Sequence, residues 1–132
     1  MKRAILDTEV LIAHWHRCIA GSPRGKSIAQ ADDWARNLVR LYDTDAIVTP
    51  VHIEFVAGTR TAHELRLARV YLSKFRTIDG GRILAEDWAE AQRIAERVPR
   101  DGKPRQLGDC LIAAIAKRLR YDVETKDRAF PR

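Results

Sequence analysis

Residues 4–13 read AILDTEVLIA, an apolar run whose middle is interrupted by two acids and a threonine. The first part, Arg3–Leu6, predicts a short buried strand, and Thr8–Ile19 continues with apolar residues at helical spacing. Asp7 therefore stands where a strand ends and a helix begins. In parallel α/β sheets ligands bind beyond the carboxyl ends of the strands, so this position suits a functional acid.

The rest of the chain alternates helices with short strands. Apolar spacing, prolines and glycines predict further helices over Ile28–Tyr42, Val51–Thr59, Ala62–Phe75, Leu84–Val98 and Leu107–Leu119. Further strands are predicted over Ala46–Thr49, Arg76–Ile78 and Asp122–Thr125. This alternation predicts one α/β domain over residues 1–132, with a mostly parallel sheet of four or five short strands flanked by helices.

Composition narrows the class of protein. Apolar residues make up 45% and charged residues 32%, and no apolar stretch approaches the roughly 20 residues that span a bilayer. The acids in the first apolar run make it a poor signal peptide, so we expect a cytoplasmic protein without a membrane partner. The net charge of +6 fits either a polyanionic partner such as nucleic acid or a generally solvated basic surface.

Four acids stand out by their surroundings: Asp7, Glu54, Asp109 and Asp127. Taken singly, each has an ordinary explanation as a helix cap, a turn residue or a solvated helix position. Taken together, they come from distant parts of the chain and are all expected at one edge of the sheet. Clustered carboxylates repel each other, and a fold that keeps them usually binds a hard cation such as Mg²⁺ or Mn²⁺. A water on such an ion can hydrolyse a phosphodiester.

Four segments, ILDTEVLIA, PVHIEFVAG, LGDCLIAAIAKRL and ETKDRAF, resemble in order those of the PIN domain family, and in particular its VapC-type toxins. The resemblance implies a Mg²⁺- or Mn²⁺-dependent endoribonuclease of a type II toxin–antitoxin module. It implies a catalytic quartet of Asp7, Glu54, Asp109 and Asp127. Of these, Asp7, Asp109 and Asp127 would hold the metal, and Glu54 would orient the attacking water. Thr8 and Thr125 match polar residues that often accompany the quartet.

The resemblance also implies partners: an RNA substrate, a second copy in a homodimer, and a cognate VapB-like antitoxin that blocks the site. Operator DNA would be bound only through the antitoxin complex. Two features depart from the family pattern. Glu9 stands where relatives often have Asn, and we favour a solvent-facing or supporting position for it over a fifth metal ligand. The chain also stops soon after Phe130, which leaves open whether a final edge strand is present.

Two other functions were weighed. A haloacid-dehalogenase-type phosphatase is disfavoured because Glu9 stands where its second Asp is needed. A non-catalytic RNA-binding domain on the same fold stays open, since fold does not settle activity.

Other side chains have less specific interpretations. A basic series forms either a phosphate-binding rim or a solvated face and loop: Arg93, Arg97, Arg100, Lys103 and Arg105. The tryptophans at helical apolar positions, Trp15, Trp34 and Trp88, are expected in the core or in dimer contacts. His14 and Cys18 share a helix face but lack further ligands for zinc.

Overall fold

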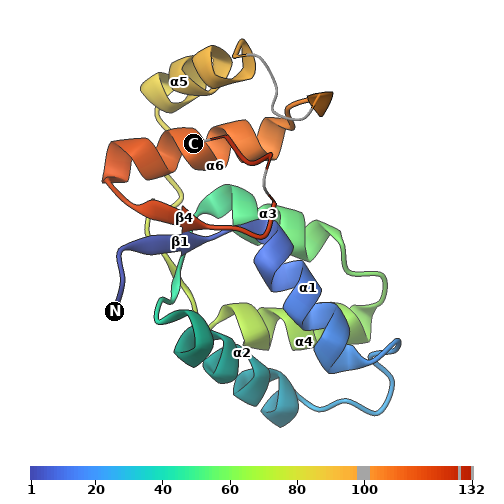
Figure 1. Cartoon of the computed structure of the whole chain (residues 1–132). Coiled ribbons are helices and arrows are strands. Elements are labelled where there is room, and N and C mark those ends of the chain that lie inside the picture. Colours follow the sequence, from blue (N-terminus) through green and yellow to red (C-terminus); the bar gives the residue numbers. More distant parts are fainter. Residues whose placement is uncertain (98–101, 128, 132) are drawn as a thin grey trace.

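The computed structural model describes residues 1–97, 102–127 and 129–131 (Figure 1). Within these residues, four parallel strands form one sheet in the order β3-β2-β1-β4. The strands are β1 (Ala4–Leu6), β2 (Ala46–Ile47), β3 (Arg76–Thr77) and β4 (Asp122–Glu124). Six helices flank them: α1 (Thr8–Ile19), α2 (Ile28–Tyr42), α3 (Thr49–Ala57), α4 (Ala62–Leu72), α5 (Ala85–Ala95) and α6 (Leu107–Leu119). The predicted α/β fold with a parallel sheet is confirmed.

Strand β1 lies in the middle of the sheet. Its residue Ile5 is paired with Ala46 of β2 on one side and with Val123 of β4 on the other. All three residues of β1 are buried, as expected for a parallel strand covered on both faces. Helix α6 lies between α5 and the strands, whereas α1, α2 and α4 lie on the opposite side (Figure 1). The carboxyl end of β1 therefore opens into the centre of the molecule.

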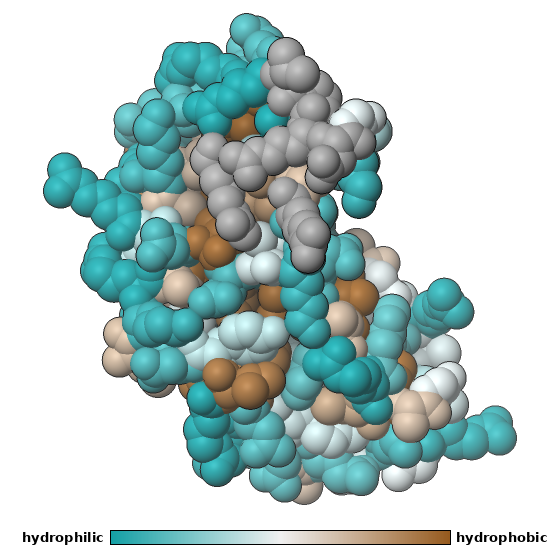
Figure 2. Space-filling model, viewed as in Figure 1, coloured by the Kyte–Doolittle hydropathy of each residue, from teal (hydrophilic) through white to brown (hydrophobic). Residues whose placement is uncertain are grey.

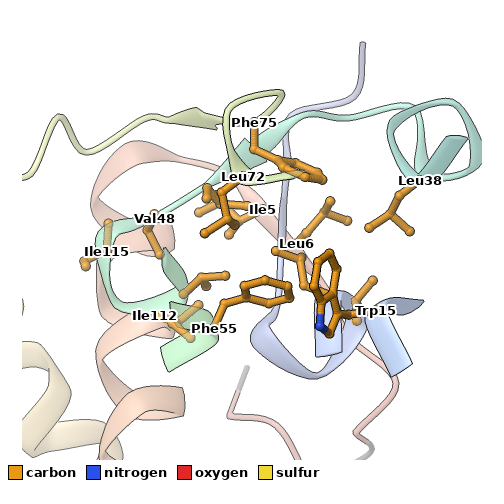
Figure 3. Close-up of a cluster of buried hydrophobic side chains, with 14 of the residues drawn as sticks. Ile5, Leu6, Trp15, Leu38, Val48, Phe55, Leu72, Phe75, Ile112 and Ile115 are labelled. Atoms are coloured by element: carbon orange, nitrogen blue, oxygen red, sulfur yellow. The ribbon is translucent and has the colours of Figure 1, made fainter. Parts of the chain in front are cut away.

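The core joins side chains from both helical layers. In Figure 3, Ile5 and Leu6 of β1 lie between Ile112 of α6 on one side and Trp15 of α1 on the other. Trp15 packs edge-on against Phe55, with ring centroids 5.4 Å apart. Burying these apolar and aromatic side chains is the main stabilising contribution to the fold.

Trp15 and Trp34 occupy the packed positions predicted for them, with their rings in an edge-on contact at 5.7 Å. Trp88 does not, because 45% of its surface is exposed, so its assignment to the core was wrong. A role for Trp88 in a dimer contact stays a prediction. The predicted apolar face of α2 is also only partly buried, since Ile28 and Leu41 are exposed.

The largest boundary error concerns the second strand and the helix after it. Strand β2 ends at Ile47, not at Thr49, and α3 begins at Thr49 with Pro50 in its first turn. Proline is tolerated there because the first N–H groups of a helix have no partner within it. Val48 is the extended residue between the two elements.

Helix α4 ends at Leu72 rather than Phe75, since the Ser73 N–H closes the last turn on Arg69 O at 3.0 Å. Helix α5 starts at Ala85, one residue later than predicted, and its predicted end at Val98 lies outside the described residues. The other strands begin or end one residue from the predicted positions, a difference within the usual uncertainty of element ends.

The surface is mostly polar on the face shown in Figure 2, where hydrophobic side chains appear as separate patches. Among the described helices, none combines the length and the apolar character needed to cross a bilayer.

Candidate active site

Asp7 is the most buried of the predicted site acids, with 1% of its surface exposed. It is the N-cap residue of α1, but its side chain makes no capping hydrogen bond. Instead Oδ2 accepts a hydrogen bond from Thr125 Oγ1 at 2.8 Å. Oδ1 is buried and has no hydrogen-bond partner among the described residues. Burial, more than any neighbour, raises the pKa of this carboxyl from 3.8 to about 6.

Asp109 lies half-buried in the first turn of α6. A helix N-terminus alone would favour the charged form and lower its pKa. The pKa is instead raised from 3.8 to about 7, first by burial and then by the charges of Asp7, Asp127, Glu54 and Glu9. Five carboxyl groups from four parts of the chain are therefore close enough to act on one another.

Glu54 reaches this cluster from α3. Its Oε1 accepts a hydrogen bond from Thr8 Oγ1 at 2.6 Å. Its carboxylate also lies directly against Gly108, where an added Cβ would come within 2.9 Å of Glu54 Cδ. The missing side chain at Gly108 lets Glu54 sit over the first turn of α6.

Asp127 is held by the turn that follows β4. Its Oδ1 accepts from the Ala129 N–H at 2.9 Å, and its own N–H donates to Thr125 Oγ1 at 3.0 Å. Thr125 thus connects Asp7 and Asp127 through a single hydroxyl. The structure brings the four predicted acids together, and their catalytic roles stay a prediction.

A pocket of about 480 Å³ opens beside these acids. Its lining comprises Thr8, Glu9, Ile12, Glu54, Lys103, Gln106, Asp109, Lys126 and Asp127. Glu9 is exposed at this pocket, which agrees with the solvent-facing position favoured for it. The two lysines place positive charge beside the acids, as an anionic substrate requires.

The family profile of the PIN domain matches residues 4–132. This chain belongs to the PIN domain family. No significant match was found among curated proteins or among solved structures. PIN domains are typically nucleases, so the predicted nuclease fold is confirmed at the level of the family. Membership leaves no support for the phosphatase alternative.

The residues of this PIN domain fit a hard divalent cation in their chemistry. Within residues 1–97, 102–127 and 129–131, no three His, Cys, Asp or Glu side chains form a ready-made ligand set. The buried Oδ1 of Asp7 is nevertheless a free acceptor, and the neighbouring donors are all carboxylates. Mg²⁺ prefers oxygen ligands and keeps several waters, so it needs only one or two carboxylates from the protein.

The basic series before Asp109 is divided between two places. Lys103 lines the acidic pocket of the PIN domain, which fits the phosphate-rim interpretation. Arg93 and Arg97 instead pair with Glu90 on α5, at 2.7 and 3.8 Å, which fits a solvated helix face. Arg100 lies outside the described residues, and Arg105 is half-buried.

Two residues of the pocket were missed by sequence reasoning. Lys126 sits inside the TKD segment, between Thr125 and Asp127, and that position was itself the available signal. Gly108 was noted only as the residue before Asp109, because no pattern in one sequence shows which side chain will approach a glycine.

His14 and Cys18 do lie together, with Cys18 Sγ 3.6 Å from His14 Nε2. His14 Nδ1 is 2.7 Å from the Tyr71 hydroxyl, which ties α1 to α4. Burial lowers the pKa of His14 to about 4, so the ring is neutral at pH 7. This pair has a packing role between helices.

Proposed function

We propose that this PIN domain is a Mg²⁺- or Mn²⁺-dependent endoribonuclease, and that it is the VapC-type toxin of a toxin–antitoxin module. The observation that carries the proposal is the buried, unpartnered Oδ1 of Asp7 beside the other site acids. A folded protein rarely leaves a buried oxygen without a partner unless a ligand uses it. A cation at that oxygen would also relieve the repulsion that raises the pKa of Asp109.

The roles follow from the contacts of each side chain. Asp7, Asp109 and Asp127 would hold the ion through their carboxylate oxygens. A divalent cation at such a site lowers the pKa of a bound water and offsets the negative charge that grows on the phosphate. Glu54 would orient the attacking water with its second oxygen, since Oε1 already accepts from Thr8. Lys103 and Lys126 would attract the phosphates of the RNA.

The proposed partners are those of a toxin of this type. RNA would be the substrate, a second copy would form a homodimer, and a VapB-like antitoxin would cover the acidic pocket. Operator DNA would be bound only by the toxin–antitoxin complex. Such a toxin would act in the cytoplasm, where its RNA substrate is found.

Cleavage of a labelled RNA, titrated with Mg²⁺ and with Mn²⁺, tests the enzymatic part. We expect cleavage only with added metal, and a loss of at least about 100-fold in Asp7→Asn and Asp109→Asn. Asp33→Asn, which changes an exposed acid on α2, is the matched control and should cleave normally. Folded variants that cleave like the unchanged protein would refute the site. RNA binding without any cleavage would favour the non-catalytic alternative.

A growth experiment tests the toxin part. Induced expression of the unchanged chain should arrest growth, and Asp7→Asn should not. Co-expression of the neighbouring reading frame should restore growth if it encodes the antitoxin. An active ribonuclease that leaves growth unaffected would contradict the toxin assignment and keep the enzymatic one.

A further inference from the structure

A second groove, of about 440 Å³, runs beside the acidic pocket between α1, α3 and α4. Ile12 lines both hollows, so the groove continues the pocket along α1. Glu9 lies in the pocket and His16 in the groove, which separates them by roughly 10 Å along the helix axis. A nucleotide next to the cleaved phosphate, or the one after it, spans that distance.

The walls of the groove combine a flat apolar surface with polar groups. Trp15, Ile19 and Phe55 supply apolar surface, while His16 and Arg60 are exposed at the rim. A base stacks on such apolar and aromatic surface, and a guanidinium at the rim can pair with a phosphate.

Glu64 gives the groove a specific acceptor. It is 7% exposed and lines the groove, and its two oxygens accept from Trp15 Nε1 and from the Arg60 N–H, both at 2.9 Å. A carboxylate has about four acceptor positions, so these two donors leave capacity for more. The Watson–Crick edge of guanine presents two adjacent N–H donors, which match that capacity.

We propose that this groove binds an unstacked base, with guanine preferred, of the single-stranded RNA whose phosphodiester lies in the acidic pocket. The inference rests on the proposed function, since it names a subsite for that substrate. Single-stranded RNA exposes its base edges and faces, which duplex RNA does not. The net charge of +6 favours RNA over an acidic or neutral peptide, and a purely apolar peptide face would leave Glu64 without a donor.

Gly58 offers a way to fill the groove without touching the site acids. It lines the groove at the end of α3, with φ −83°, so any L-residue fits its backbone. A Cβ there would meet only carbonyl oxygens at 3.5 and 3.7 Å, which is ordinary contact. Gly58→Phe therefore fills the groove, and Gly58→Ala is the matched control that leaves it open.

Two measurements use the full chain. Fluorescence anisotropy in EDTA measures the affinity for a guanine-containing single-stranded RNA, and we expect Gly58→Phe to weaken it about tenfold and Gly58→Ala to leave it unchanged. Cleavage of a dinucleotide, which cannot reach the groove, should be equal in all three proteins. Glu64→Gln should reduce the preference for guanine over uracil without removing cleavage.

The outcomes separate the subsite from the enzymatic proposal. If Gly58→Phe binds and cleaves RNA like the unchanged protein, the subsite is wrong and the nuclease stands. If the unchanged chain cleaves nothing but Gly58→Phe still binds RNA more weakly, the nuclease is wrong and the base site stands. If Gly58→Phe loses only the binding of an antitoxin peptide, the groove is a peptide site and the inference is overturned. Equal melting temperatures of the three proteins exclude misfolding as the cause.

Discussion

At the scale of single residues, Asp7 is destabilising for the protein without metal. Its carboxylate is buried, and only one of its oxygens has a hydrogen bond. The same neighbourhood raises the pKa of Asp109, so the cluster resists full ionisation. A bound cation would turn this unfavourable arrangement into a favourable one, because the charges then have a partner.

The raised pKa values predict how stability depends on pH. Asp7 moves from 3.8 to about 6 and Asp109 from 3.8 to about 7, so the folded chain binds more protons than the unfolded chain between these values. Their contribution is fully present below about pH 4 and is lost as the pH rises through 6 and 7. In EDTA, Asp7→Asn should therefore raise the free energy of unfolding by roughly 1–2 kcal/mol at pH 8 and change it little at pH 4.

Urea denaturation at pH 4 and pH 8 measures this difference. Acids with lowered pKa values, such as Asp87, have the opposite pH dependence in both proteins and cancel in the comparison. An Asp7→Asn variant that is less stable than the unchanged chain at pH 8 would show that the buried charge is compensated in solution.

Gly108 gives a second prediction for a single residue. Gly108→Ala should favour helix α6 by up to about 1 kcal/mol, because alanine is the better helix former. The new methyl group would nevertheless displace Glu54, and cleavage should fall at least about tenfold. Gly58→Ala adds a methyl group without a clash and should leave cleavage unchanged.

The shorter acid supplies a rescue. In the Gly108→Ala background, Glu54→Asp withdraws the carboxylate and should recover part of the lost activity, although Glu54→Asp alone should reduce it. Thermal melting and cleavage rates of the four proteins complete the cycle. Full activity of Gly108→Ala alone would mean that the position of Glu54 is not critical.

At the scale of elements, helix α3 is capped from outside its own segment. Val48 precedes the helix and has no polar side chain, so it cannot cap the first turn. Asp79, from the turn after β3, accepts from the Thr49 N–H at 3.0 Å and from Thr49 Oγ1 at 2.8 Å. The start of α3, and with it Glu54, therefore depends on a residue thirty positions later in the chain.

We expect Asp79→Ala to destabilise the protein by about 1–3 kcal/mol, since it leaves the Thr49 N–H and hydroxyl without their acceptor. Asp79→Asn keeps one acceptor oxygen and should cost less. Chemical denaturation of both variants measures the difference. A loss of stability no larger in Asp79→Ala than in Asp79→Asn would show that water replaces the cap.

The elements also show where prediction from sequence ends. Alternating apolar segments were enough to place the strands and helices, because burial dictates their periodicity. The start of α3 was missed because its cap comes from Asp79, which the sequence presented only as part of a turn. Trp88 was assigned to the core by helical spacing alone, and spacing does not show whether another element covers that face.

At the scale of the whole molecule, parallel topology explains why the candidate site was predictable. All strands point the same way, so residues after β1 and β4 meet at one edge whatever their distance in sequence. Asp7 and Asp127 could be paired on that basis, and the PIN resemblance added Glu54 and Asp109. The flanking Lys126 and the groove beyond Ile12 could not be predicted, since both depend on how the helices pack.

Metal binding should couple the site to the stability of the entire fold. Residues Asp7, Asp109 and Glu54 belong to different elements, so an ion among them ties α1, α3 and α6 together. Protons compete for the same oxygens, and the pKa values of about 6 and 7 set the range of that competition. We expect Mn²⁺ to raise the melting temperature by several degrees at pH 8, and by much less at pH 5.

Differential scanning fluorimetry with Mn²⁺ and with EDTA at the two pH values measures this coupling. Asp109→Asn should abolish the shift, whereas Asp33→Asn, on the exposed surface of α2, should keep it. A shift that is equal at both pH values, or that survives in Asp109→Asn, would place the ion elsewhere on the surface. The acid cluster would then be destabilising at neutral pH without a compensating ligand, and the burial of Asp7 would require another explanation.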